Sequence, residues 1–204
     1  MQYDLTLITV RPGTHGKALP LVEKWLKANP GKGEFLACLY SDIGALNQIM
    51  LLHGYEDPAA LAADREAVAF GGEPFGCLEF ITAVSRDTYT PFPMAEPIKP
   101  GQYGPIFEVR TYLLRPASLV PTIKAWEGSV PNRVKLSRML TAMYTVSGST
   151  PRFVHIWPYP SLNERAQIRA KAVETGVWPP PGGPDHLLTQ QTDIFLPASF
   201  SPIR

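Results

Sequence analysis

The chain has few cysteines and no long hydrophobic run. Only Cys38 and Cys77 occur in 204 residues, too few for a disulfide framework and not in the spacing of a metal site. No apolar run approaches the roughly 18 residues that a membrane-spanning helix requires. The first residues, MQYDLTLITVRPG, lack the basic region and long apolar core of a signal peptide. We therefore expect a reduced, cytoplasmic protein without a membrane span.

The chain also has no large excess of positive or negative charge, and it lacks the common cofactor motifs. Charged residues make up 18% of the chain and the formal net charge is +1, without a long basic run, which argues against a nucleic-acid partner. The glycine-rich fingerprints of nucleotide sites are absent, as are H-E-x-x-H, C-x-x-C and G-x-S-x-G. The four histidines do not form a ligand spacing. We predict neither a metal nor a cofactor, and no motif decides whether the protein is an enzyme.

What the chain does contain is an internal repeat. The segment YDLTLITVRPGT, beginning at Tyr3, matches FEVRTYLLRPAS, beginning at Phe107. Later pairs keep the same offset: Tyr40 with Tyr144, Gly44 with Gly148, Ile49 with Phe153, and Tyr55 with Tyr159. Self-similarity at a fixed offset indicates two copies of one structural unit.

Hydrophobic periodicity predicts the same order of elements in each half. In the first half we expect strands at 3–10, 34–41, 48–55 and 76–85, and helices at 15–28 and 58–69. In the second half we expect strands at 107–114, 139–146, 153–159 and 186–196. One helix there is marked by Leu119, Ile123, Trp126 and Val130, and another begins at the capping box Ser161 to Glu164. Each half is therefore β-α-β-β-α-β.

This order predicts an α+β fold, in which two ferredoxin-like β-α-β-β-α-β repeats pack sheet to sheet as an α+β barrel. We place the first repeat at residues 1–89, a proline-rich linker at 90–105 and the second repeat at 106–204. An intrachain barrel does not require a partner. A homo-oligomer formed through the outer surfaces or the linker stays open.

The residues of both halves resemble the NIPSNAP family, most clearly in the second half. The resemblance is carried by FEVRTYLLRPASL and HIWPYPSLNERAQIRA, and in the first half by LNQIMLLHGYEDPAALAADREA. It implies a fold of the dimeric α+β barrel superfamily, in which related barrels include monooxygenases, small-molecule isomerases and haem enzymes. It implies no settled reaction. The first half departs from the motif, with Thr6, Ile8 and His53 where the second has Arg110, Tyr112 and Trp157, so a site carried by those residues should be single.

Alternation along two strands of the second half places the candidate residues on one sheet face. They are Glu108, Arg110 and Tyr112 on 107–114, and His155, Trp157 and Tyr159 on 153–159. The first and third strands of a ferredoxin-like sheet are neighbours, so the two rows should be adjacent. We expect the aliphatic face to meet the helices and this row to point into the barrel.

Such a row predicts a cavity for a small, partly hydrophobic ligand that carries an anionic or carbonyl group. The protein would bind or transform this molecule in the barrel cavity of the second repeat. His155 and Glu108 are the candidate catalytic residues. Arg110, Tyr112, Trp157 and Tyr159 are the candidate substrate-binding residues.

Each candidate also has a structural interpretation. His155 can be a buried histidine bonded to a neighbour, or a haem ligand, instead of a general acid or base. Glu108 and Arg110 can form a plain ion pair. The helix residues Arg165 and Arg169 should bond loop carbonyls or carboxylates such as Glu164, and Trp178 should close the barrel end. For the whole protein, the alternative is a non-enzymatic interaction module with a filled barrel.

Overall fold

A computed structural model describes residues 1–147 and 151–204. Gly148, which the repeat pairs with Gly44, lies outside the described residues. The chain forms two compact units. The first unit comprises Met1–Thr90, Lys99–Gln102 and Phe195–Arg204, and the second comprises Pro91–Ile98 and Tyr103–Ile194. Residues 195–204 therefore belong to the first unit, although they follow the second repeat in the sequence.

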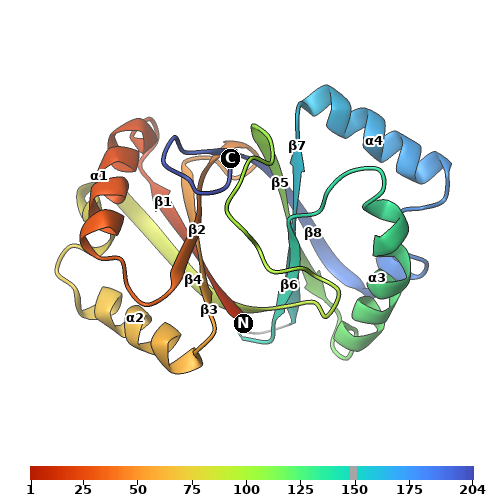
Figure 1. Cartoon of the computed structure of the whole chain (residues 1–204), viewed down its shortest axis with the longest axis horizontal. Coiled ribbons are helices and arrows are strands. Elements are labelled where there is room, and N and C mark those ends of the chain that lie inside the picture. The colour runs from red at the N-terminus through yellow and green to blue at the C-terminus, as the bar shows by residue number, and fades with distance from the viewer. Residues whose placement is uncertain (148–150) are drawn as a thin grey trace. The chain divides into compact units, whose positions relative to one another are not determined.

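The first unit is a four-stranded antiparallel sheet covered on one face by two helices (Figure 1). Its elements are β1 (Gln2–Val10), α1 (His15–Ala28), β2 (Glu34–Ile43), β3 (Gln48–Tyr55), α2 (Pro58–Phe70), the short helices η1 (Pro74–Gly76) and η2 (Leu78–Phe80), and β4 (Ile81–Pro91). The strand order is β4-β1-β3-β2. The first and third strands are central neighbours, as predicted.

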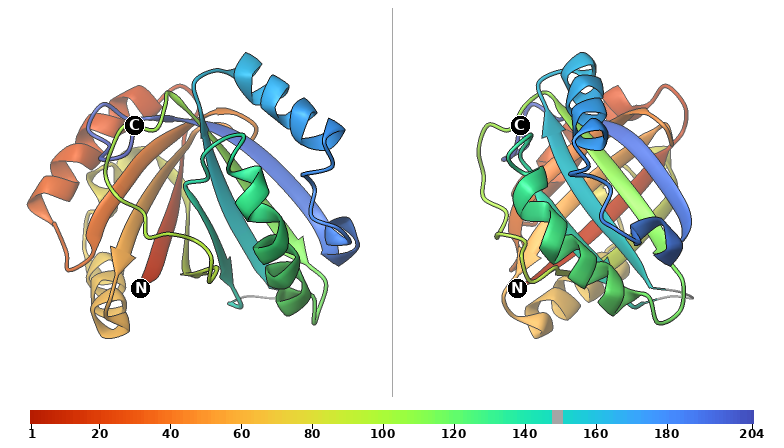
Figure 2. Two further views of the ribbon diagram at one scale, coloured as in Figure 1. Left: turned by 45° about the vertical axis from the view of Figure 1, so that its right-hand side comes forward. Right: turned by 90° about the vertical axis from the view of Figure 1, so that its right-hand side faces the viewer.

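The second unit repeats this plan, with α3 and α4 on one face of its sheet (Figure 2). Its elements are β5 (Ile106–Leu114), α3 (Leu119–Arg133), β6 (Thr141–Thr145), β7 (Arg152–Tyr159), α4 (Leu162–Glu174), η3 (Gly183–His186) and β8 (Leu187–Pro197). The strand order is β8-β5-β7-β6. The two β-α-β-β-α-β repeats predicted from the sequence are confirmed.

Local side chains explain where several helices begin. The Asp57 carboxylate accepts from the Ala59 amide, and Pro58 is the first residue of α2. The Ser161 hydroxyl accepts from the Glu164 amide at 3.1 Å and caps α4. The Ser161 cap is where the sequence predicted it, and α2 begins where the helix at 58–69 was predicted.

The fourth strand differs from its predicted bounds. We expected it to begin at Gly76, but β4 begins at Ile81 and continues to Pro91, inside the segment predicted as linker. Phe75 and Gly76 adopt positive φ values of 60° and 67°, which belong to a turn and cannot continue a strand. The two short helices therefore occupy the start of the predicted strand.

Both faces of each sheet are buried. The aliphatic row of the second unit, with Phe107, Val109 and Ile156, is at most 3% exposed, and so are Glu108, His155 and Trp157 on the opposite face. Such strands are buried on both faces, so burial alone does not reveal which face meets the helices. Cys38 and Cys77 are buried free thiols. Among the described residues, no helix is long and apolar enough to cross a membrane.

Candidate functional site

The row of polar and aromatic side chains in the second unit faces α3 and α4. On the sheet, Arg110 pairs with His155 and Glu108 with Trp157. From α3, the Trp126 ring lies 4.7 Å from the His155 ring between centroids. From α4, Arg165 donates to Glu108. The two rows are adjacent as predicted, but the expectation that they point into a barrel while the aliphatic row meets the helices is wrong. The physical reason is that the helices supply the aromatic and charged partners that these side chains need.

Glu108 is the centre of a cluster of arginines. Its side chain is fully buried, and its Oε1 accepts from Arg110 Nη1 at 3.0 Å and from Arg165 Nη2. Arg169 Nη1 lies 3.7 Å from the same oxygen. Three guanidinium groups thus share one carboxylate, which leaves an excess of positive charge. Arg165 and Arg169 thus approach a carboxylate, as the sequence led us to expect, but it is that of Glu108 and not that of Glu164.

Arg110 links this cluster to a phenol. Its Nε donates to the Tyr112 hydroxyl, and its guanidinium carbon lies 5.2 Å from the centre of the Tyr112 ring. Burial raises the pKa of Tyr112, although Arg110 acts in the opposite direction. Tyr112 is therefore a neutral phenol at pH 7, and since its oxygen accepts from Arg110, its own proton remains available to another acceptor.

His155 is held in one tautomer by its neighbour. The indole Nε1 of Trp157, which can only donate, lies 2.7 Å from His155 Nδ1. In the neutral ring the proton is therefore on Nε2, a buried atom for which the described part of the chain supplies no partner. Burial, followed by the charges of Arg110, Arg169 and Arg133, holds the pKa of His155 well below its ordinary value of 6.5. This geometry favours a structural histidine over a general base, because its one lone pair is already engaged.

The depressed pKa of His155 gives stability a definite pH dependence. The folded state keeps the ring neutral, whereas the unfolded chain takes up a proton near pH 6.5. The stabilising contribution is therefore complete above that pH and is lost as the pH falls below it. In His155→Gln, which keeps an acceptor for Trp157, urea titrations should show a slope of stability against pH that is smaller by about 1.4 kcal/mol per pH unit between about pH 6 and 5. A comparison at about pH 8, where both states hold a neutral ring, isolates the packing cost. A wild-type slope in the variant would contradict this account.

Aromatic rings fill the space between the sheet and α3. Trp126 packs edge-on against Phe153 at 5.3 Å and against Trp178 at 4.9 Å between ring centres. Trp157 also contacts Trp178, at 6.0 Å. Trp178 thus belongs to this cluster on the helix side of the sheet, which corrects the expectation that it closes a barrel end.

A fourth arginine, Arg133, lies buried at the end of α3. Its guanidinium carbon lies 4.4 Å from the centre of the Trp157 ring. Its Nη2 donates to the Tyr159 hydroxyl at 3.1 Å. Trp157 and Tyr159 are therefore held by partners within the fold, and these contacts favour their packing interpretation.

Between the sheet and the two helices lies a cavity of about 260 Å³. Its polar lining includes two arginines, a phenol, a hydroxyl and an amide: Arg110, Arg169, Tyr112, Thr122 and Gln190. Its apolar lining is mainly aromatic and proline side chains: Trp126, Phe153, Trp178, Pro179, Pro180, Pro184, Leu187 and Val173. Convergent polar groups at one side of an aromatic cavity are typical of a ligand site. Among the described residues, no group of three or more His, Cys, Asp or Glu could hold a metal ion.

Comparisons with known proteins concern mainly the second half of the chain. The NIPSNAP family model matches residues 107–202. The second repeat is NIPSNAP-like. The "Protein NipSnap homolog" of Dictyostelium discoideum is 32% identical over 73 residues, which cover 36% of this chain and 33% of that protein. The chain thus spans about a third of the length of this curated relative. The resemblance predicted from the second-half motifs is confirmed.

Two solved structures are similar to the chain. A NIPSNAP family protein from Agrobacterium tumefaciens str. C58 is 27% identical, with 48% of this chain and 98% of that chain covered and a TM-score of 0.46. An anthrone oxidase-like protein is 11% identical, with 97% of this chain and 91% of that chain covered and a TM-score of 0.70. The second likeness extends over nearly the whole chain and confirms the α+β barrel fold class.

The NIPSNAP-like repeat brings only some of the predicted site residues to its cavity. Arg110 and Tyr112 line it. None of the other four candidates is among the described residues that line the cavity. Glu108 accepts from Arg110 and Arg165. The side chains of His155, Trp157 and Tyr159 are buried and packed within the fold. The predicted residues therefore form one continuous row. Arg110 and Tyr112 line the cavity, and the other four residues support them from within the fold.

Three of the lining residues that sequence reasoning missed come from outside the sheet of the NIPSNAP-like repeat. Arg169, Trp126 and Trp178 come from α4, α3 and the segment after α4. A signal existed for Arg169, because Arg165 and Arg169 are four apart and share a helix face. No local pattern could reveal that this face lies over Glu108, 57 residues away from Arg165 along the chain.

Proposed function

We propose that the protein binds a small, partly hydrophobic anion, such as an aromatic carboxylate, in the cavity of the NIPSNAP-like repeat. The observation that carries this proposal is that Arg110 and Arg169 both line the cavity while they share a single carboxylate with Arg165. An anionic ligand would supply the negative charge that this cluster lacks.

The electrostatics of the site support an anion. Burial, followed by the positive charge of Arg110, lowers the pKa of Arg169, which means that its charged form is under-compensated. The neutral Tyr112 phenol adds no charge. A carboxylate in the cavity would accept from the arginines in charge-assisted hydrogen bonds, which are stronger than those between neutral groups.

The shape of the site supports a small aromatic body. The volume of about 260 Å³ admits one or two rings. Trp126 and Trp178 present their indoles to it, and such surfaces pack well against flat apolar groups. The name of the anthrone oxidase-like protein, which shares this fold, agrees with an aromatic ligand.

If the bound molecule is also transformed, the chain offers a specific proton donor. Tyr112 lines the cavity, and its hydroxyl oxygen accepts from Arg110, so its proton points to another acceptor. Glu108 and His155, the predicted catalytic pair, act in this arrangement as positioning residues. Glu108 orients the arginines, and His155 fixes the Trp157 indole.

The test uses 2-naphthoate as the probe, measured by isothermal titration calorimetry. Arg169→Gln should weaken binding by about tenfold to a hundredfold, because a hydrogen bond to a charged group is worth about 1.5–3 kcal/mol. The uncharged 2-acetylnaphthalene should not respond to this substitution.

Arg165→Gln is the matched control. Arg165 contacts Glu108, but it is not among the described residues that line the cavity. It should lower stability while binding of 2-naphthoate falls much less than in Arg169→Gln. Equal losses of affinity in the two variants would show that Arg169 is structural. Failure of the wild-type protein to bind 2-naphthoate would favour the interaction-module alternative.

A further inference from the structure

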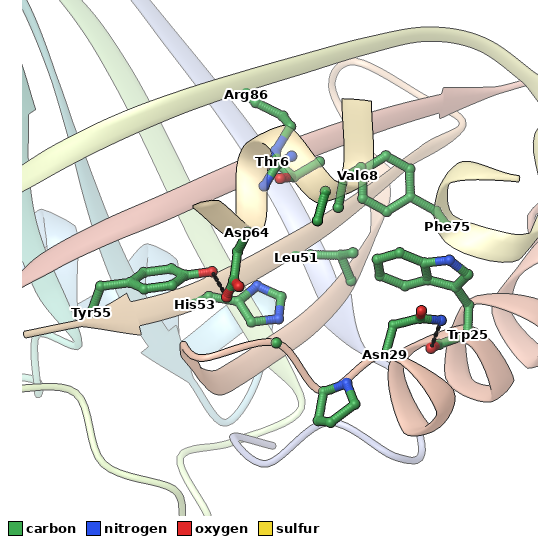
Figure 3. Close-up of a pocket in the computed structure, with 13 residues that line it drawn as sticks. Thr6, Trp25, Asn29, Leu51, His53, Tyr55, Asp64, Val68, Phe75 and Arg86 are labelled. Carbon is green, nitrogen blue, oxygen red and sulfur yellow. Dashed lines mark hydrogen bonds between the residues drawn. The ribbon is translucent and has the colours of Figure 1, made fainter. Parts of the chain in front are cut away.

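The first unit contains a cavity of its own, although the sequence led us to expect a single site. Its volume is about 240 Å³, and it lies between the sheet and helices α1 and α2. Figure 3 shows Arg86 and Thr6 at one end, Trp25 and Asn29 at the other, and Leu51, Val68 and Phe75 along the side. These residues lie outside the segment that matches the NIPSNAP family model.

At the polar end of this cavity, the lining residue Arg86 has a donor without an acceptor in the described part of the chain. Asp4 is 1% exposed and accepts from Arg65 Nε and from Arg86 Nη2, both at 2.8 Å. Among the described residues no partner is found for the buried Arg86 Nε, nor for the buried Nη2 of the neighbouring Arg65, which does not line the cavity. An unpaired buried donor costs about 1–3 kcal/mol, so an acceptor brought by a ligand would be favourable here.

His53 is a second polar group in this wall without a partner. It lines the cavity and packs against Phe35, with 5.4 Å between ring centres. Its ring nitrogens make no hydrogen bond to any residue in the described part of the chain. Burial lowers its pKa, so the ring is neutral at pH 7 and offers one donor and one acceptor.

Asp64, by contrast, has one carboxylate oxygen held by three donors. Its Oδ2 accepts from the amides of Lys32 and Gly33 at 2.6 and 3.2 Å, and from the Tyr55 hydroxyl at 3.1 Å. A Cβ on Gly33 would lie 2.3 Å from the Tyr55 ring, so the loop before β2 fits against Tyr55 only with glycine. On this side of the cavity Asp64 Oδ2 is bonded within the protein, so Arg86 and His53 are the polar groups that would contact a ligand.

The two cavities differ in the balance of positive and negative charge around them. In the first unit the guanidinium groups of Arg65 and Arg86 both pair with the Asp4 carboxylate, and a second carboxylate, that of Asp64, lines the cavity, so the two charges of each sign balance. In the second unit one carboxylate faces three guanidinium groups. Because a balanced site does not compensate the desolvation of an anion, the first cavity favours a neutral hydrogen-bond acceptor.

We infer that the first unit holds a second, independent binding site for a small uncharged aromatic carbonyl compound. Its carbonyl oxygen accepts from the Arg86 guanidinium, which lines the cavity, and His53 is the second polar contact. Its ring packs on Trp25 and Phe75, which themselves lie 5.3 Å apart between ring centres.

The experiment uses 2-acetylnaphthalene as the probe and 2-ethylnaphthalene, which lacks the carbonyl, as its control. Calorimetry should show binding of the ketone and at least about tenfold weaker binding of the hydrocarbon. Val68→Trp, which fills the cavity, should abolish binding of the ketone but leave binding of 2-naphthoate unchanged. Arg169→Gln should instead weaken binding of 2-naphthoate and leave binding of the ketone unchanged.

A second readout places the ketone without relying on a variant that might not fold. In ¹⁵N-labelled protein the ketone should shift the indole resonance of Trp25, identified with Trp25→Phe, and leave that of Trp178 in place. Binding that persists in Val68→Trp, or a shift of Trp178 instead of Trp25, would overturn the inference. Loss of ketone binding in Arg169→Gln would do the same. The site proposed for the anion is tested separately by 2-naphthoate, so either proposal can fail alone.

Discussion

Replacement of Glu108 by glutamine is expected to lower the free energy of unfolding by about 3–5 kcal/mol. The glutamine has the same shape but no charge, so Arg110, Arg165 and Arg169 would be left crowded together without a counter-ion. Glutamine would also place an amide where three guanidinium donors need an acceptor. Urea denaturation at about pH 7, with the slope against denaturant checked for constancy, measures the effect.

Glu127→Gln serves as the control for this prediction. Glu127 is exposed on α3, so removal of its charge should change stability by no more than about 0.5 kcal/mol. If Glu108→Gln is as stable as this control, the arginines do not depend on the buried carboxylate. The positive excess proposed to attract a ligand would then have to be reconsidered.

Replacement of Trp126 by alanine is the second change with a large expected effect, a loss of about 3–5 kcal/mol. Trp126 is 3% exposed and contacts the rings of Phe92, Phe153, His155 and Trp178, all within 5.7 Å between ring centres. Its removal leaves a large void, because these rings are held by the sheet and cannot collapse into it. Thermal and urea unfolding measure the loss.

Trp25→Ala provides the comparison, since Trp25 is the tryptophan of helix α1 in the first repeat. Trp25 is only partly buried and contacts one ring, that of Phe75. Its loss should therefore cost clearly less than that of Trp126. Equal costs would indicate that the aromatic cluster of the second unit contributes little beyond ordinary burial.

The elements could be predicted from the sequence wherever a local signal fixed them. The bounds of α1 and β3 follow from periodicity and flanking turns, and the starts of α2 and α4 follow from Asp57 and Ser161. The start of β4 could not be predicted in this way. The segment from Gly76 contains strand-forming residues, and only the positive φ values of Phe75 and Gly76 show that a turn comes first.

The residues that share a sheet face could be predicted from the sequence, but whether that face meets the helices could not. Alternation shows that Arg110 and Tyr112 share a face, yet it cannot show which face the helices cover when both are buried. We assigned the aliphatic row to the helices because helices usually cover apolar surface. The deciding contacts, from Arg165 and Arg169 to Glu108, depend on tertiary structure that no local pattern contains.

The place of residues 195–204 bears on how the protein folds while it is being synthesised. The Cys38 amide on β2 donates to the Ser201 hydroxyl at 3.0 Å, and the Ala198 amide donates to the Cys38 carbonyl at 2.9 Å. Cys38 and Ser201 are 163 residues apart along the chain, which a ribosome needs roughly 10–30 s to add. During that interval the β2 edge lacks these partners, and an unpaired edge is open to association with other chains. The first unit therefore cannot be completed before the second has been translated, and a chaperone that shields β2 on the nascent chain should raise the yield of folded protein.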